Sequence, residues 1–219
     1  MKYFIANWKM NMSLKDIVSW LEEFSKLELK QDLNRHIIIC PSFPHLSLLK
    51  EVSGKIGFEV GAQDLSMFEK GAHTGETGNF QLKELVNYCI VGHSERKESV
   101  DTVIIKKDLC IKAGIIPLIC FVDKKDLIKL DTKGVILCWE DPNNISKDGV
   151  YREKNPLDIA KEMREIIERV SKETVIIYGG SVNRENIKSL NEIKEIDGVL
   201  VGNAGLDPNH FADIINTAI

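Results

Sequence analysis

The sequence predicts an α/β protein, a closed (β/α)8 barrel of parallel strands with a reduced fifth helix. Two observations lead to this fold class. Eight short runs rich in Ile, Val, Tyr and Phe are apolar almost throughout, as in strands buried on both faces. Stretches with helical periodicity separate them, and the runs recur about every 28 residues, the length of one strand–helix unit.

A doubly wound open sheet would show the same alternation, but it has about five or six strands. Eight units with almost no residues left over favour the closed barrel. No Gly/Ser-rich linker divides the chain, so residues 1–219 are expected to form one domain. The expected strands are Tyr3–Trp8, His36–Cys40, Gly57–Ala62, Tyr88–Gly92, Ile115–Cys120, Gly134–Trp139, Thr174–Gly179 and Gly198–Gly202.

Three helices carry clear start signals. Ser13 is a suitable N-cap for an amphipathic helix that runs to Leu27. Pro156 is expected to open a helix that runs to Val170, and Asp207-Pro208 opens the last helix in the same way.

Two units are short. The second and third strands start unusually close together, and the stretch DKKDLIKLDTK must supply the whole fifth crossover. The fifth helix is therefore expected to have barely two turns.

Composition limits the possible functions. Of the 219 residues, 43% are hydrophobic and 28% charged, which excludes a disordered chain, a collagen-like repeat and a small disulfide scaffold. With 29 basic and 33 acidic residues, the net charge of −4 argues against a nucleic-acid partner.

Five cysteines without a CxxC pair indicate reduced thiols in a cytoplasmic protein. No apolar run reaches signal-peptide or membrane-spanning length, so no membrane partner is expected.

In a barrel, the side chains that follow each strand meet at one mouth, where chemistry takes place. Taken singly, Lys9 could lie on the surface, His93 could cap a helix and Glu140 could be a solvated loop acid. Together on one rim they indicate anion binding and proton transfer. The polar candidates are Asn7, Lys9, Gln63, His93, Ser94, Glu95, Glu140, Ser181, Gly202 and Asn203.

The turns YGGSV and VGNAG place flexible backbone ahead of the last two helices, which suits a phosphate group. No cluster of His, Cys or carboxylates has metal-ligand spacing, and no GxGxxG follows the first strand. Neither a metal nor a cofactor is therefore expected.

Five motifs occur in one order across nearly the full chain. They are NWKMN (Asn7–Asn11), GAQDLS with GAHTGETG (Gly61–Gly78), VGHSERK (Val91–Lys97), YGGSV (Tyr178–Val182) and DGVLVGNA (Asp197–Ala204). In these motifs the sequence resembles the triosephosphate isomerase family. The resemblance implies a TIM barrel and a cofactor-free isomerase of glycolysis and gluconeogenesis. Such an enzyme interconverts D-glyceraldehyde 3-phosphate and dihydroxyacetone phosphate through an enediol(ate).

The resemblance also implies catalytic roles. Glu140 would move a proton between the two substrate carbons, and His93 would polarise the carbonyl as a neutral imidazole, a feature known for this family. Lys9 would supply a fixed positive charge, and Asn7 would donate a hydrogen bond to the substrate. Glu95 is expected to orient Lys9 rather than to act as a second base.

A lid after Glu140 would close over the substrate, but this lid departs from the family pattern. The family's YEPVWAIGTG is replaced by WEDPNNISKDG, so Ser146 stands where a glycine N–H meets the phosphate. Slower or incomplete closure is therefore expected. CFVD replaces CIGE after the fifth strand, and Asn203 replaces a glycine in a turn that Asn can tolerate. The residues expected to bind substrate are Asn7, Lys9, Ser146, Ser181, Gly202 and Asn203.

The long Gly-rich segment Gly61–Gly78 suggests assembly. In the family this loop projects into a partner subunit, with a threonine at the position of Thr74, so a homodimer is expected. The shortened fifth unit leaves a tetramer open.

Two other functions are compatible with a barrel of this kind. One is a non-catalytic sugar-phosphate-binding barrel derived from this family, which would not need Lys9, His93 and Glu140 together. The other is a barrel isomerase for a larger phosphorylated sugar, which the complete VGHSER and NWKMN motifs disfavour.

Overall fold

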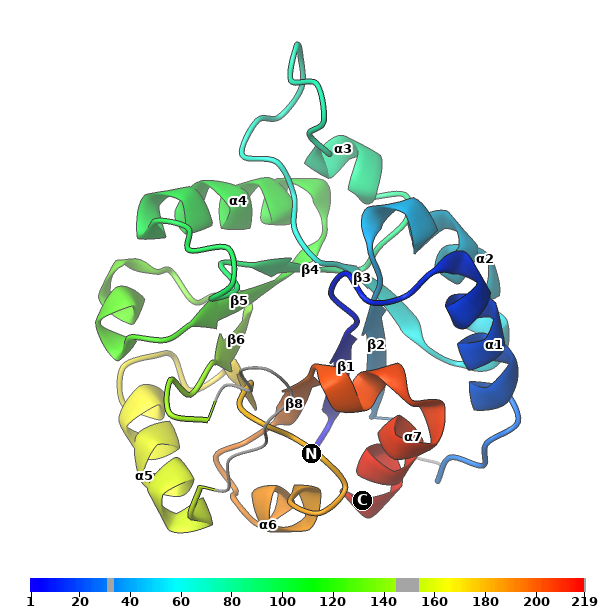
Figure 1. Ribbon diagram of the computed structural model, residues 1–219. Coiled ribbons are helices and arrows are strands. Elements are labelled where there is room, and N and C mark those ends of the chain that lie inside the picture. The colour runs from blue at the N-terminus through cyan, green and yellow to red at the C-terminus, as the bar shows by residue number, and fades with distance from the viewer. Residues whose placement is uncertain (31–33, 145–153, 219) are drawn as a thin grey trace.

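The computed structural model describes residues 1–30, 34–144 and 154–218. It is a closed barrel of parallel strands in the chain order β1 to β8, with helices around the outside (Figure 1). This confirms the predicted fold class, and the strand ends differ from the expected ones by at most two residues, with β2 as expected. The strands are β1 (Tyr3–Asn7), β2 (His36–Cys40), β3 (Glu59–Ala62), β4 (Tyr88–Val91), β5 (Ile116–Phe121), β6 (Ile136–Trp139), β7 (Val175–Tyr178) and β8 (Gly198–Val201).

The barrel closes where the first strand meets the last. Tyr3 of β1 pairs with Gly198 of β8, and Ala6 pairs with Val201. A Cβ atom on Gly198 would lie 2.2 Å from the Tyr3 carbonyl oxygen, so this pairing requires glycine. Because every strand pair is parallel, all the C-terminal strand ends open onto one mouth.

The helices begin where the sequence signals them. Ser13 caps α1 through a capping box with Asp16, Pro156 opens α5, and Asp207 caps α7. Helices α1 and α5 end about three residues earlier than expected, because their last turns tighten into i→i+3 hydrogen bonds. The α-helices are α1 (Leu14–Phe24), α2 (Leu46–Ile56), α3 (Asn79–Leu82), α4 (Val100–Ala113), α5 (Pro156–Ile167), α6 (Ile187–Asn191) and α7 (Pro208–Thr217).

The fifth crossover is even smaller than expected. It forms a 3₁₀ helix, η2 (Lys124–Lys129), in which Leu127 is the buried residue. Lys124 Nζ joins it to α5 through carboxylate oxygens of Glu162 at 2.6 Å and Glu165 at 2.5 Å. The second crossover, expected to be short, carries a full helix α2, whereas α3 and α6 are short without an obvious sequence signal.

Two apolar clusters hold the barrel together. Along β1, Ile5 points into the lumen, whereas Phe4 and Ala6 pack outward beneath the helices. The lumen is filled by Ile5, Ile38, Cys40, Tyr88, Ile90, Leu118, Cys120, Ile136, Cys138, Ile177 and Leu200. All five cysteines are buried free thiols, as the sequence predicts. Within the described ranges, no helix is long and apolar enough to cross a bilayer.

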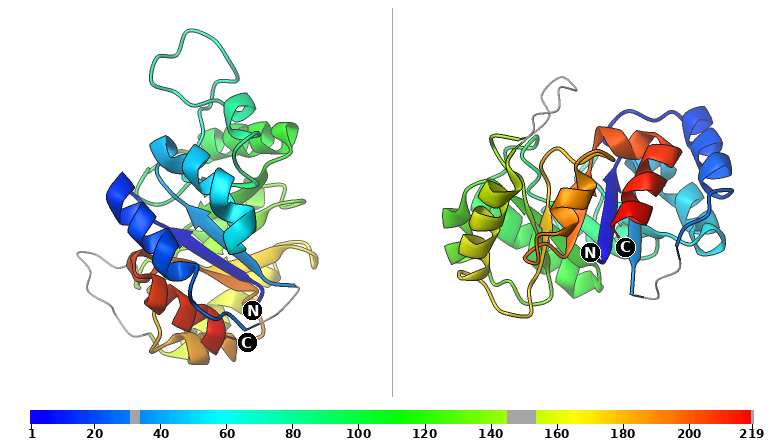
Figure 2. Two further views of the ribbon diagram at one scale, coloured as in Figure 1. Left: turned by 90° about the vertical axis from the view of Figure 1, so that its right-hand side faces the viewer. Right: turned by 90° about the horizontal axis from the view of Figure 1, so that it is seen from below.

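The segment between β3 and α3 extends away from the barrel, as the cyan loop at the top of Figure 1 and the left view of Figure 2 show. The N-terminus and the end of α7 lie close together in all three views (Figures 1 and 2), since β1 pairs with β8 and α7 follows β8 in the chain. Of the described chain, the segment between β3 and α3 protrudes farthest from the barrel (Figures 1 and 2).

Gly198→Ala is expected to lower the free energy of unfolding by about 3 kcal/mol, because the added Cβ forces β1 and β8 apart. As a control, Gly54→Ala in α2 meets no atom within 4 Å and should raise that free energy by about 0.5–1 kcal/mol. Urea unfolding followed by far-UV circular dichroism measures both. Equal stability of the two variants would contradict the account of the seam.

Candidate active site

The carboxylate of Glu140 is buried at the mouth of the barrel. Glu140 follows β6 and is only 2% exposed. Its Oε2 accepts from the Ser94 N–H at 2.8 Å, and its Oε1 accepts from the Ser94 hydroxyl at 2.7 Å. His93 Nε2 lies 3.4 Å from the same Oε1. The loop after β4 thus supplies both the donors that hold the carboxylate and the imidazole beside it.

The surroundings of His93 favour a neutral ring. Its Nδ1 accepts a hydrogen bond from the Glu95 N–H at 3.3 Å, which assigns the ring proton to Nε2. Burial lowers the pKa of His93 below its ordinary value, assisted by Lys9, although Glu140 and Glu95 act in the opposite direction. The Nε2–H group is therefore a neutral donor beside the Glu140 carboxylate.

Lys9 lies beside His93 in a constrained backbone conformation. Its φ is +51°, in the left-handed region that residues with a Cβ rarely adopt. The carbonyl of Lys9 accepts from Gln63 Nε2 at 2.8 Å and from the Ser42 hydroxyl at 3.0 Å. Its ammonium group pairs with Glu95 Oε1. Three loops therefore fix the position of this cation.

Asn7, the last residue of β1, is buried at the base of the same loop. Its Oδ1 accepts from the Lys9 N–H at 3.1 Å, so Asn7 also stabilises the strained turn. The predicted residues Asn7, Lys9, His93, Glu95 and Glu140 are thus brought together on one side of the mouth.

The predicted phosphate turns lie after β7 and β8. A Cβ on Gly202 would lie 3.8 Å from Lys9 Cε, which places this turn next to the cation. Asn203 is exposed at the start of the 3₁₀ helix η3 (Asn203–Leu206). Ser181 is buried, and both its N–H and its hydroxyl donate to the Asn144 carbonyl at 2.8 Å.

The first residues of the lid are anchored by contacts that sequence reasoning missed. Asp141 is fully buried and accepts from Lys154 Nζ at 2.7 Å, and that ammonium group lies 5.0 Å from the centre of the Trp139 ring. Asn144 Nδ2 donates to the Tyr178 hydroxyl at 2.9 Å. The partners in each contact are far apart in sequence, so no local sequence pattern predicts these contacts.

Ser146 and the rest of the lid up to residue 153 lie outside the described residues. Ser94 is among the polar candidates that the sequence predicts at the mouth, but the sequence does not predict that it holds Glu140. Among the described residues, no three His, Cys, Asp or Glu side chains are grouped to hold a metal ion.

Comparison with known proteins identifies the family. A sequence model described as triosephosphate isomerase matches residues 2–131 and 124–218. The chain belongs to the triosephosphate isomerase family. The triosephosphate isomerase of Aquifex aeolicus (strain VF5) is 32% identical over 241 aligned positions, which cover 96% of each chain. That of Mesomycoplasma hyopneumoniae (strain 7448) is 34% identical over 244 positions, covering 98% of each chain.

Family membership extends to the activity. The triosephosphate isomerase of Thermodesulfovibrio yellowstonii (strain ATCC 51303 / DSM 11347 / YP87) is 32% identical over 243 positions, covering 98% of each chain. These matches span the barrel from β1 to α7, so the chain is an isomerase of the triosephosphate isomerase family.

The buried neutral His93 should make the fold sensitive to acid. The pKa of His93 is lowered in the folded state. As the pH falls below the ordinary value of 6.5, the unfolded chain therefore binds a proton at this residue while the folded chain does not. Stability is lost as the pH falls through 6.5, and the loss is complete below the folded pKa. His93→Gln should remove this contribution.

Urea unfolding of the wild type and His93→Gln from about pH 7.5 to about pH 5.5 measures the effect. The wild type should lose more unfolding free energy over this interval than the variant. His73→Gln, on the exposed loop, is the surface control and should follow the wild type. Parallel curves for the wild type and His93→Gln would contradict a lowered pKa.

Proposed function

We propose that Glu140, His93 and Lys9 carry out the isomerisation of D-glyceraldehyde 3-phosphate and dihydroxyacetone phosphate in this chain. The carrying observation is that the Glu140 carboxylate lies 3.4 Å from His93 Nε2 in a buried position at the mouth. A base and a neutral donor at this spacing can act on adjacent atoms of one small substrate.

Glu140 is the base. It takes a proton from the carbon next to the carbonyl and returns it to the neighbouring carbon. In the resting arrangement its two oxygens accept from the N–H and hydroxyl of Ser94, which compensates the burial of a charge. To reach the substrate, the carboxylate exchanges these hydrogen bonds for contact with the substrate carbon.

The other polar residues stabilise the enediol(ate). His93 donates its Nε2–H to the carbonyl oxygen and moves protons between the two substrate oxygens. Lys9 provides a positive charge that Glu95 and the surrounding loops hold in place. Asn7 orients the Lys9 turn through its Oδ1 and donates to the substrate through its amide nitrogen.

The phosphate group binds across the mouth at Ser181, Gly202 and Asn203, close to the Lys9 side chain. In the resting arrangement the Ser181 donors are already bonded to the Asn144 carbonyl. A phosphate must therefore displace this lid contact before it can accept from Ser181. Substrate binding and movement of the lid base are coupled in this way, with Ser146 as a further expected contact after closure.

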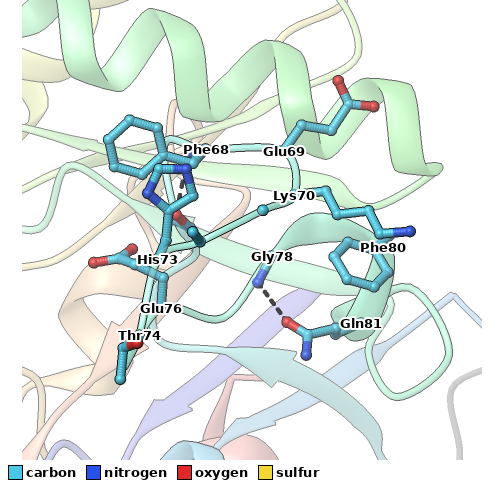
Figure 3. Close-up of a pocket in the computed structure, with 12 residues that line it drawn as sticks. Phe68, Glu69, Lys70, His73, Thr74, Glu76, Gly78, Phe80 and Gln81 are labelled. Carbon is cyan, nitrogen blue, oxygen red and sulfur yellow. Dashed lines mark hydrogen bonds between the residues drawn. The ribbon is translucent and has the colours of Figure 1, made fainter.

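A second copy of the chain is the partner we propose for the projecting loop within Gly61–Gly78. The loop presents Met67 and Phe68, and the following helix α3 presents Phe80, each about two-fifths exposed. Together they border a hollow of about 430 Å³ that Thr74 helps to line. Figure 3 shows Phe68 beside His73, with the rings stacked at 3.9 Å, and Phe80 on the other side of the hollow. Such an apolar rim suits an interface in a homodimer.

We further infer one folding unit in the cytoplasm. One unit is supported by the pairing of β1 with β8, which joins the two ends of the chain. A reducing compartment is supported by the five buried free thiols.

Glu140→Asp should lower kcat at least about 100-fold, because the shorter side chain withdraws the carboxylate by about 1 Å. Glu140→Gln should abolish turnover and still bind a phosphorylated enediolate mimic. Isomerisation of glyceraldehyde 3-phosphate, coupled to glycerol-phosphate dehydrogenase, measures both. A loss below about ten-fold in Glu140→Asp would exclude Glu140 as the base. An inactive wild type that binds the mimic would instead favour a sugar-phosphate-binding protein.

Inorganic phosphate should inhibit competitively, raising KM for glyceraldehyde 3-phosphate without changing kcat, because it occupies the turns at Ser181 and Gly202. Sulfate should act in the same way, and sodium chloride at equal ionic strength is the control. Inhibition that lowers kcat alone, or none beyond that of the salt control, would refute this phosphate site.

Thr74→Arg should convert a dimer into monomers in sedimentation velocity, because it places a charge in the proposed interface. Ile128→Arg changes an apolar residue of η2 that is 77% exposed, and it should leave the dimer intact. A larger wild-type assembly that Ile128→Arg reduces would assign a tetramer contact to the shortened fifth unit. A monomeric wild type at micromolar concentration would refute the dimer.

A further inference from the structure

A buried lysine lies behind the loop that carries His93. Lys106 is on α4, and only 4% of the residue is exposed. Its ammonium group contacts Asp64 Oδ1 at 2.6 Å and Glu98 Oε1 at 2.5 Å. Asp64 follows β3 at the base of the projecting loop, and Glu98 follows β4. One cation therefore joins two mouth loops to a helix, although the isomerisation described above assigns it no role.

Arg96 completes a charge-balanced cluster of two acids and two bases. Its Nη2 lies 2.7 Å from Asp64 Oδ2, and its Nε lies 3.4 Å from Glu98 Oε1. Burial raises the pKa of Asp64 despite the neighbouring cations. For Glu98, burial acts in the same direction, but the contacts with Lys106 and Arg96 outweigh it and hold the pKa below its ordinary value. Removing Lys106 leaves two carboxylates near each other with one partly exposed cation.

The cluster touches the catalytic loop directly. Glu98 Oε2 accepts from the N–H of Gly92, the residue before His93, at 3.3 Å. Gly92 has φ +76°, and a Cβ there would lie 2.8 Å from Val103 and 3.0 Å from the Cys120 carbonyl. The backbone is thus closely confined at this point, and Glu98 fixes one of its polar groups.

The same loop contains a strained residue between two members of the cluster. Lys97 has φ +55°, a left-handed conformation that is unfavourable for a residue with a Cβ. Arg96 and Glu98, its neighbours in sequence, are both held by ion pairs. Strain of this kind persists only where the surroundings fix the backbone on both sides. The ion pairs therefore keep the segment from His93 to Glu98 from relaxing.

We propose that Lys106 is a positioning residue for the isomerisation, acting through Glu98 and Arg96 to hold the backbone that places His93 and Glu95 at the mouth. The proposal rests on the function proposed above. Lys106 lies behind the loop and does not touch the substrate. Since Asp64 stands at the base of the projecting loop, the same cation also links the proposed dimer contact to the catalytic histidine.

The test compares Lys106→Met with Lys107→Met. Lys107 is the next residue on α4, its side chain is similarly buried, and it pairs with the exposed Asp108 at 2.9 Å, outside the cluster. Each variant is assayed for kcat, for KM with glyceraldehyde 3-phosphate, and for inhibition by inorganic phosphate and by a phosphorylated enediolate mimic. Circular dichroism establishes that each variant is folded.

For Lys106→Met we expect kcat to fall about 10- to 50-fold and the mimic to bind more weakly by a similar factor, because a displaced imidazole stabilises the enediolate less well. Inorganic phosphate binds at the turns after β7 and β8, whereas the Lys106 cluster holds the loop after β4, so the inhibition constant of phosphate should stay within about two-fold of the wild type. Lys107→Met should resemble the wild type in all four quantities.

If Lys106→Met does not fold, Glu98→Gln provides the same test. An amide has one acceptor oxygen, so it can accept from Lys106 or from the Gly92 N–H but presents a donor to the other. For Glu98→Gln the mimic is again expected to bind more weakly, while the inhibition constant of phosphate stays close to that of the wild type. Equal kcat in the Lys106 and Lys107 variants, or in Glu98→Gln and the wild type, would overturn the proposal, as would equal weakening of the mimic and phosphate. An inactive wild type would instead overturn the proposed function.

Discussion

The pairing of β1 with β8 is the constraint on which the rest of the molecule depends. Once the first strand lies against the last, all the parallel strands end at one mouth, and residues from opposite ends of the chain become neighbours. Lys9 and Gly202 illustrate this, since a Cβ on Gly202 would nearly touch the lysine side chain. The closure needs a glycine at position 198, because any side chain there would meet the Tyr3 backbone. The geometry of the site therefore follows from the seam.

Both central groups of the site, the Glu140 carboxylate and the His93 imidazole, are buried, and each is accommodated in a different way. The Glu140 carboxylate is removed from water, but two donors from Ser94 compensate it. The imidazole of His93 has a backbone N–H on Nδ1, and burial lowers its pKa. A carboxylate acceptor and a neutral imidazole donor thus lie side by side. Behind them, the ion pairs of Lys106 offset the strain of a loop that would otherwise relax.

The sequence predicted the barrel because strands buried on both faces leave continuous apolar runs, such as Thr174–Gly179 around β7. It also placed Glu140 and His93 at strand ends, where the topology brings them together. It did not predict the contacts of Ser181 with Asn144 or of Asp141 with Lys154, because those depend on loop paths that carry no periodic signal. The 3₁₀ form of the fifth crossover was also missed, since its residues favour helix but leave too few positions for one.

The small fifth crossover has a consequence for where the molecule opens. It buries Leu127, and ion pairs from Lys124 to two partly exposed carboxylates of α5 hold it to that helix. A segment with so little apolar burial has a low free energy of local unfolding. The pairing of β5 with β6 beneath it therefore has to hold through its own hydrogen bonds and lumen side chains. Amide protons of η2 should be lost to exchange long before those of the strands, which makes the lumen, not the helical shell, the stable core on this side of the barrel.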